Sequence, residues 1–485
     1  MTMRRRDALK RMGGLAAAAG MAKFLPSCGD NTDDRPVGIT TYVYLMMENR
    51  SYDHLFGARS RFEGKAGDGF PADLMMPDAN DVLVAPYAPP GREASCVLDP
   101  PHGWTAAHNS FNGGAMNHFL KEHQADHPGS NEALQYLTRE QVPVSYALAD
   151  AYTVCDRWFC SVMGPTLPNR AYWHAASSLG LMANTEVLNM FGAGIPIPSI
   201  YNRLEEKGVD WAYYYGNLAV VSLLGNPGPH QVELGPNDGT GHIRRFGDAL
   251  AGSGQFFKDA AAGTLPSVCY IDPTFSENDD HPPVHPILGQ ELIASIYTAL
   301  ANSPQWNNIL FVVTYDENGG FFDHVPPPTT VDDTEATFGV PGFEQMGFRV
   351  PTMVIGPYAK QNYVSSVVYD HTSALKHLQD EFGLETLNPR MNAANNLMDC
   401  IDLDRLAAGD PAPPVEIPLV DRFEWPTTDQ RCMSAGGFRT AHDPISEWAE
   451  ATGGFRPEYD LRGQTNNQQL IYDYLAQQRA ARSRK

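Results

Sequence analysis

Four short segments of almost continuous apolar residues constrain the fold of this 485-residue chain more than any other feature. They are rich in β-branched and aromatic residues, and they lie at residues 39–47, 267–271, 308–315 and 350–355. Such runs are typical of strands that are buried on both faces of a sheet. Helical patterns lie between and beside them, at residues 145–152, 289–301 and 373–382. This order predicts an α/β fold with a mostly parallel central sheet, helices on both faces and long loop insertions.

Polar residues follow two of these predicted strands directly. Glu48 and Asn49 end the first, and Asp316 and Glu317 end the third. Open parallel sheets bind their ligands at the carboxyl ends of the strands, so the two pairs meet if their strands are close. Adjacent buried carboxylates repel each other unless a cation is present, and oxygen ligands suit Ca²⁺, Mg²⁺ or Mn²⁺, with iron and zinc left open. The alternative is that these residues are solvated turn acids.

The segment Gly164-Pro165-Thr166-Leu167-Pro168-Asn169-Arg170 indicates a helix start, because Pro168 suits the first helical turn. Thr166 is then expected just before the helix, where exposed amides and the helix dipole favour a phosphate group. A hydroxyl at that point, next to a cation, can attack phosphorus. Asn169 and Arg170 would donate to phosphate oxygens. An ordinary capping threonine is the alternative.

Several histidines lie beside acids or prolines in loop-like surroundings, namely His102, His281, His324 and His371. A histidine beside a carboxylate can bind a metal, protonate a leaving group or hold a phosphate. Each can equally be a surface residue.

The N-terminus reads as an export address rather than as part of the fold. Arg4, Arg5 and Arg6 precede a short apolar segment that is too short to cross a bilayer, as in a twin-arginine signal. The sequence 25–28 (LPSC) resembles a lipoprotein cleavage box, so Cys28 is a candidate for a lipid anchor. The six other cysteines permit disulfides, and none forms the CxxC pair of a structural zinc site.

The net charge and the distribution of residue types along the chain indicate which partners are disfavoured and where the segments begin and end. The net charge of −22 argues against nucleic acid as a partner and against capture by anionic lipid. We predict an export signal over 1–28, a linker over 29–38, a catalytic domain over 39–460, and a C-terminal helix with a basic tail over 461–485. Residues 57–100 and 323–347 are rich in Gly, Pro and Asp and are predicted to be loops or insertions. No segment of the mature chain is apolar and long enough to be a transmembrane helix.

The motifs resemble those of the bacterial phospholipase C and acid phosphatase family. Residues 47–57 (MENRSYDHLFG) are similar to its N-terminal signature, and residues 314–328 (TYDENGGFFDHVPPP) to its second. Residues 347–351 (GFRVP) and 369–373 (YDHTS) resemble a third and a fourth. Residues 164–170 resemble the nucleophile segment, and residues 148–156 resemble the stretch before it. The motifs occur in the family's order between residues 39 and 390.

This resemblance implies an alkaline-phosphatase-like fold and assigns roles to the candidate residues. A divalent metal ion would be held by Glu48, Asn49, Asp316, Glu317 and Thr166. Thr166 would also be the nucleophile and form a covalent phospho-threonine. His281 would be a phosphate-site histidine that protonates the leaving alcohol, and His102 would act similarly. His371 would orient the carboxylates of the second signature.

The resemblance leaves the ester open. Members of the family are phospholipases C, which release diacylglycerol and a phospho-headgroup such as phosphocholine, or acid phosphatases, which act on phosphomonoesters. We expect the first, on a phospholipid substrate, with location in the periplasm, on a membrane tether or outside the cell. A choline site needs an aromatic cage, which Trp211 and residues 213–215 could supply, although such a run also suits a core. A non-catalytic surface binding protein is the third alternative.

Overall fold

The computed structural model describes residues 38–91, 96–187, 196–216, 218–223, 241–246, 254–275 and 278–420. The predicted export signal over 1–28, the linker over 29–38 except its last residue, and the C-terminal helix and tail over 461–485 lie outside these residues. The predicted catalytic domain is therefore described only as far as residue 420. Within the described ranges, we find no helix with the length and apolarity that crossing a membrane requires.

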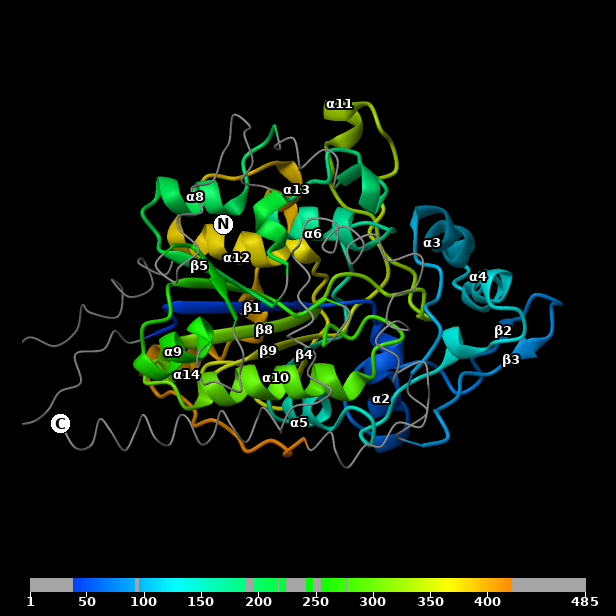
Figure 1. The fold of residues 1–485 in the computed structure, drawn as a ribbon, viewed down its shortest axis with the longest axis horizontal. Coiled ribbons are helices and arrows are strands. Elements are labelled where there is room, and N and C mark those ends of the chain that lie inside the picture. Colours follow the sequence, from blue (N-terminus) through cyan, green and yellow to red (C-terminus); the bar gives the residue numbers. More distant parts are fainter. Residues whose placement is uncertain are drawn as a thin grey trace, which may run out of the picture. The chain divides into compact units, whose positions relative to one another are not determined.

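The core of the molecule is a sheet of eight strands in the order β10-β4-β9-β8-β1-β7-β5-β6. All pairings are parallel except those of β9, which runs antiparallel to both β8 and β4. Figure 1 shows the strands crossing the centre of the molecule. Their bounds are β1 Thr41–Met47, β4 Thr153–Cys155, β5 Trp211–Tyr215, β6 Ile243–Arg245, β7 Val268–Asp272, β8 Ile309–Tyr315, β9 Thr352–Ile355 and β10 Tyr363–Ser365.

Helices cover both faces of this sheet (Figure 1). One face carries α6 (Thr166–Ala175), α8 (Ile200–Glu206), α12 (His371–Phe382) and α13 (Pro389–Ala393). The other carries α5 (Pro143–Ala151), α9 (Gln255–Ala262) and α10 (Pro286–Ala301). The mostly parallel α/β arrangement that the sequence predicted is confirmed.

The predicted elements match the observed ones closely. The four apolar segments are β1, β7, β8 and β9, and the three helical patterns are α5, α10 and α12. Every residue of β1 and β8 is buried, as expected for central strands. The aromatic run at Trp211 is β5, which is buried throughout, so its core alternative is confirmed and the choline-cage alternative is wrong.

The two predicted insertions contain short elements of their own. The first holds α2 (Ala58–Glu63), β2 (Met76–Pro77) and β3 (Leu83–Val84), and the second holds α11 (Thr334–Phe338). Helices α3 (Trp104–Phe111) and α4 (Phe119–Asp126) follow the first, and α14 (Leu403–Ala408) lies near the end of the described chain. Phe70, Met76 and Phe119 belong to a second apolar cluster that joins this region together.

Three of the motifs, residues 47–57, 314–328 and 347–351, meet in a buried ion cluster. The Arg349 guanidinium is fully buried, lies 2.9 Å from Asp323 Oδ1 and 3.2 Å from Asp53 Oδ1, and covers the Tyr52 ring. His324 completes the cluster, with Nδ1 2.6 Å from Asp53 Oδ2. Burial lowers the pKa of His324, but its hydrogen bonds to Asp53 and Asp68 outweigh burial and raise the pKa to about 9. The cluster fastens the segments after β1 and β8 to the segment before β9.

We expect His324→Gln to remove a pH-dependent part of the stability. Because the folded-state pKa is raised to about 9, this contribution is complete below the unfolded pKa of about 6.5 and is lost as pH rises through about 9. The wild type should therefore lose about 2 kcal/mol of unfolding free energy, relative to the variant, between those pH values. Urea unfolding across that range measures it. His118→Gln, which removes an imidazole outside the cluster, is the control, and equal pH slopes for wild type and His324→Gln would contradict the assignment.

Candidate active site

The two predicted ligand pairs lie side by side, because β1 and β8 are neighbours. Their last residues, Met47 and Tyr315, are opposite each other in the parallel register. The Asp316 amide donates to the Met47 carbonyl at 3.0 Å, and the Asn49 amide donates to Asp316 Oδ1 at 3.0 Å. Gly319 allows this close approach, since a Cβ there would lie 2.2 Å from the Asn49 carbonyl oxygen. Segments some 270 residues apart therefore form one site.

Each of these four side chains presents a buried oxygen that accepts no hydrogen bond from the described part of the chain. The four residues are at most 2 % exposed, and the atoms are Glu48 Oε1, Asn49 Oδ1, Asp316 Oδ2 and Glu317 Oε1. A buried oxygen that accepts no hydrogen bond is costly, so this set is incomplete as it stands. Three carboxylates and one amide are the ligand chemistry of a divalent cation. The residues present therefore fit the metal that the sequence predicted.

Arg170 supplies the positive charge that these carboxylates face. Its buried guanidinium lies 3.2 Å from Glu48 Oε1, 3.4 Å from Asp316 Oδ2 and 2.9 Å from Asp272 Oδ1. The sequence predicted that Arg170 donates to phosphate. The structure instead encloses its guanidinium among three protein carboxylates.

One arginine does not balance all the negative charge of the site. Burial raises the pKa of Glu317 to about 8, opposed by His102 and increased by Asp316. Burial likewise raises the pKa of Glu48, and the Asp316 carboxylate adds to that rise. The surroundings therefore disfavour the ionised form of these carboxylates. A bound cation would stabilise that ionised form.

Thr166 is the first residue of α6, one position further into the helix than the sequence predicted. It is 2 % exposed and follows Pro165, whose backbone is extended. Asn184 Oδ1 accepts from the Leu167 amide at 2.8 Å and so fills one of the free amides at this helix start. Thr166 and Arg170 are four residues apart and share one face of α6. Because Arg170 contacts Glu48 and Asp316, that face of α6 is the one turned toward the ligand set.

Asn169 holds the loop before Thr166 rather than offering a donor to substrate. Its Nδ2 lies 3.0 Å from the Gly164 carbonyl and 3.2 Å from those of Val162 and Pro165, and its Oδ1 accepts from the Val162 amide at 2.9 Å. Both ends of the amide are engaged by backbone. The structure therefore gives Asn169 a positioning role and corrects the expectation that it donates to phosphate.

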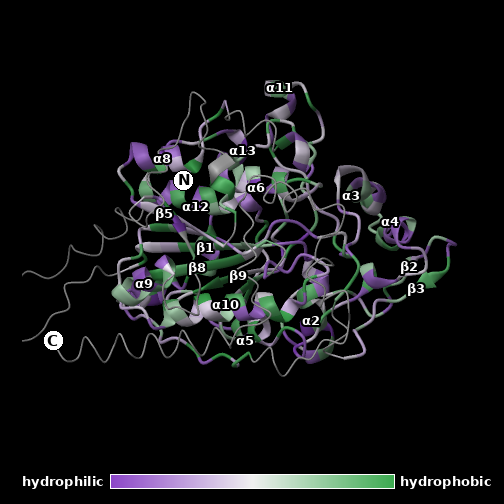
Figure 2. Ribbon diagram, in the orientation of Figure 1, coloured by the Kyte–Doolittle hydropathy of each residue, from purple (hydrophilic) through white to green (hydrophobic). Residues whose placement is uncertain are grey.

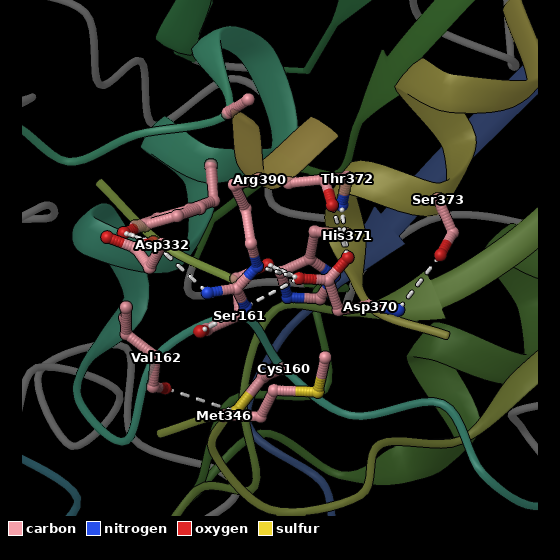
Figure 3. Close-up of polar contacts among 12 residues, drawn as sticks. Cys160, Ser161, Val162, Asp332, Met346, Asp370, His371, Thr372, Ser373 and Arg390 are labelled. Carbon is pink, nitrogen blue, oxygen red and sulfur yellow. Dashed lines mark hydrogen bonds and ion pairs between the residues drawn. The ribbon is translucent and has the colours of Figure 1, made fainter. Parts of the chain in front are cut away.

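The same loop is held on its other side by Arg390 (Figure 3). The guanidinium donates to the Ser161 carbonyl at 2.9 Å and to Asp370 Oδ2 at 2.6 and 2.9 Å. Asp370 also accepts from the Thr372 amide and so caps α12. Next to it, His371 Nε2 donates to the Asp316 carbonyl at 2.7 Å, which ties α12 to the ligand set. The fourth motif, residues 369–373, therefore supports the loop before Thr166 and the segment that carries Asp316.

The two histidines expected at the phosphate lie together. The rings of His102 and His281 are 5.7 Å apart between centroids, and His102 Nε2 is 3.7 Å from Glu317 Oε1. Each Nδ1 lies 2.7 Å from a backbone carbonyl, which leaves the lone pair of a neutral ring on Nε2. Burial lowers the pKa of His102, but Glu317 and Asp99 outweigh it and raise the pKa above its ordinary value.

Two further groups of side chains have the spacing of metal ligands. One is Asp99 with His102 and His281, and the other is the Asp53, Asp323 and His324 part of the ion cluster. The second is already balanced by Arg349. The first borders the four-oxygen set through the contact of His102 with Glu317.

A cavity of about 1010 Å³ opens beside His102 and Pro165. Its walls come from the residues before and at the start of α3, the end of α4 and residues 182–185. They include Asp99, Trp104 and Asp126, while the described lining contains no lysine or arginine. Sequence reasoning missed this cavity, since α3 and α4 carry no motif that connects them to the site.

Comparison with known protein families identifies the family of this chain. The profile of the phosphoesterase family matches residues 39–385, which is most of the chain. The chain belongs to the phosphoesterase family. This phosphoesterase is accordingly a hydrolase that acts on phosphate esters, as the sequence motifs predicted.

Its relatives include bacterial and plant proteins. Phospholipase C A of Mycobacterium tuberculosis is 31% identical over 443 residues, which cover 80% of this chain and 82% of that protein. Non-specific phospholipase C6 of Arabidopsis thaliana is 30% identical over 383 residues, covering 72% and 69%. A solved structure of a protein in the alkaline phosphatase superfamily from Vibrio parahaemolyticus matches distantly, with a TM-score of 0.36 and 11% identity over 74% of this chain and 70% of that one.

Proposed function

We propose that this phosphoesterase is an exported, metal-dependent phospholipase C that cleaves phospholipid to diacylglycerol and a phospho-headgroup. The observation that carries the metal dependence is the set of four buried oxygens, one from each expected ligand, that accept no hydrogen bond from the described residues. The lipid substrate is supported by relatives that are named as phospholipases C at about 30% identity. Export is supported by the arginine-rich N-terminus, and residue Cys28 would carry a lipid anchor if one is added.

The chain's own residues divide the reaction between them. Thr166 Oγ1 attacks phosphorus, and the bond from phosphorus to the alcohol oxygen breaks. His281, in its imidazolium form, gives the proton on Nε2 to the departing alcohol, while the proton of the Thr166 hydroxyl passes to solvent, and protonated His102 donates to a phosphate oxygen. Glu48, Asn49, Asp316 and Glu317 would hold the cation, which would neutralise charge on the phosphate and favour the ionised Thr166 hydroxyl. Water then attacks phosphorus and gives a proton to His281, the bond from phosphorus to Thr166 Oγ1 breaks, and the phospho-headgroup leaves with Thr166 restored.

The cavity suits the non-phosphate part of such a substrate. It adjoins His102 and Pro165, and its only charged side chains among the described lining, apart from histidine, are the carboxylates Asp99 and Asp126. An anionic group is disfavoured there, whereas a cationic ammonium is favoured by these carboxylates and by the Trp104 ring. A phosphocholine ester fits this chemistry better than an anionic ester does. The alternative, a phosphatase acting on phosphomonoesters, would use the same reacting residues.

Phosphorus NMR of the purified protein tests this proposal. We expect phosphocholine to appear from mixed phosphatidylcholine micelles, to stop appearing after chelation of divalent cations, and to return when a cation is restored. Each of Ca²⁺, Mg²⁺, Mn²⁺, Fe²⁺ and Zn²⁺ is added separately to identify the metal. Inorganic phosphate from a monoester alone would make the protein a phosphatase. Full activity after chelation would contradict the metal dependence.

A further inference from the structure

Exposed apolar side chains are concentrated in the first insertion of the chain. Four of the nine exposed large apolar side chains of the described residues fall between residues 62 and 83. They are Phe62 at 57 %, Met75 at 42 %, Val82 at 58 % and Leu83 at 59 % exposed. Figure 2 shows the hydrophobic colour of β3 at the outer edge of the molecule. We call these four residues the apolar rim.

The β2–β3 hairpin that carries Val82 and Leu83 is held in place by packing and by hydrogen bonds. Met76 of β2 is fully buried in the second apolar cluster, next to Phe119 and Leu120 of α4. The turn between β2 and β3 is closed by Asp78, whose Oδ1 accepts from the amides of Asn80 and Val82 at 2.8 and 2.9 Å. Val82 and Leu83 are therefore exposed beside an ordered turn. Binding through these two side chains would cost little conformational entropy, because the backbone is already held in place.

The hairpin is connected to the active-site cavity through α4. The Ala79 amide donates to Gln124 Oε1 of α4 at 2.9 Å. Ala125, Asp126 and His127, which come next in the chain, line the cavity beside His102. Phe62 reaches the same cluster from α2, because its ring lies 5.6 Å from that of Tyr136. The apolar rim and the cavity thus belong to one packed unit beyond the carboxyl ends of the strands (Figure 1).

The charges around the hairpin select one kind of lipid surface. Asp78 and Asp81 lie in its turn, Asp73 lies just before it, and the ammonium of Lys121 is 2.5 Å from Asp81 Oδ1. An anionic surface would repel these carboxylates and a chain with a net charge of −22. A zwitterionic surface carries no such penalty and accepts apolar side chains at its boundary.

We propose that the apolar rim is the element by which this protein docks on a zwitterionic phospholipid surface, with Val82 and Leu83 inserted at the lipid boundary and the cavity brought to the headgroups. The biological role of this docking rests on the proposed phospholipase function. The docking itself is binding to a lipid surface and can be measured without turnover. The hairpin supplies no reacting group. Changes in it should therefore alter binding to a lipid surface and leave the hydrolysis of a dissolved ester unchanged.

The test compares vesicle binding with turnover of a dissolved substrate. All proteins are full chains carrying Cys28→Ser, so that no lipid on residue 28 contributes. The double variant Val82→Asp/Leu83→Asp should bind phosphatidylcholine vesicles at least about tenfold more weakly in co-sedimentation. It should keep wild-type turnover of monomeric dibutyrylphosphatidylcholine. Leu83→Trp should bind more tightly than wild type, which gives a change in the opposite direction.

A matched control changes two equally exposed apolar residues elsewhere. Leu403 and Leu419 are 51 % and 55 % exposed, and Leu403→Asp/Leu419→Asp adds the same charge without touching the hairpin. Its vesicle binding should equal that of the wild type. If both double variants bind like wild type, or if both lose binding equally, the docking role of the hairpin is overturned.

The outcomes also separate this inference from the proposed function. Absence of turnover of dibutyrylphosphatidylcholine by the wild type would overturn the phospholipase function, while co-sedimentation would still decide the docking. Tighter binding to vesicles that contain anionic phosphatidylglycerol than to phosphatidylcholine alone would overturn the choice of a zwitterionic surface.

Discussion

Replacing Thr166 by alanine should reduce turnover by on the order of 10⁴-fold while the protein stays folded. The hydroxyl that would form the new bond to phosphorus is removed. The structural cost should be about 1 kcal/mol, because the substitution deletes only a hydroxyl and a methyl group at the start of α6. Thr166→Ser, which keeps the hydroxyl, should retain turnover within about a hundredfold of the wild type.

Three measurements separate loss of the proposed nucleophile from loss of the fold. Steady-state hydrolysis of a soluble phosphodiester gives the loss of turnover, and urea unfolding gives the change in stability. Acid quenching during turnover, followed by peptide mapping, should show a phosphorylated peptide that contains residue 166 in the wild type and not in Thr166→Ala. Retention of full activity by Thr166→Ala, or phosphate on a different residue, would remove Thr166 from the nucleophile role.

The elements of this fold were predictable where their residues are apolar throughout. β1 and β8 are buried on both faces, so their sequences carry no polar alternation and differ clearly from loops and amphipathic helices. The short elements β2, β3 and α11 were missed, because two to five residues among Gly, Pro and Asp give no periodic signal. Their positions depend on tertiary contacts such as the burial of Met76 against α4.

The site was predictable in its residue types and not in its arrangement. Glu48 and Asp316 were identified because each follows a buried strand, but the adjacency of β1 and β8 depends on the strand order of the whole sheet. Asn169 was given the wrong role because a side-chain amide suits a phosphate and a backbone loop equally well in sequence. Trp104 was overlooked because only the path of α3 brings it to the cavity. Pairings of distant residues are set by topology, which local patterns do not encode.

Arg170 was also misjudged, and its removal should produce the largest change in stability. Arg170→Met leaves Glu48, Asp272 and Asp316 buried without their common cation, which should cost about 3–5 kcal/mol of unfolding free energy in a chelator at pH 7.5. Burial already raises the pKa of Asp272 and of Glu48 while Arg170 is present. The folded variant should therefore hold protons that the unfolded chain has released, so its deficit should shrink as pH falls toward 5.

Urea unfolding in the presence and absence of a divalent cation decides between the two roles for Arg170. If Arg170 balances the ligand carboxylates, the cation should restore part of the lost stability. Arg203→Met, which removes an arginine paired with the exposed Glu206 at 2.9 Å, should change the unfolding free energy by less than about 1 kcal/mol. If Arg170 instead served the phosphate, as its sequence position suggested, Arg170→Met would raise KM and leave the unfolding free energy close to that of the wild type. The burial of its guanidinium among three carboxylates favours the first result, because removing a buried charge leaves its partners without compensation.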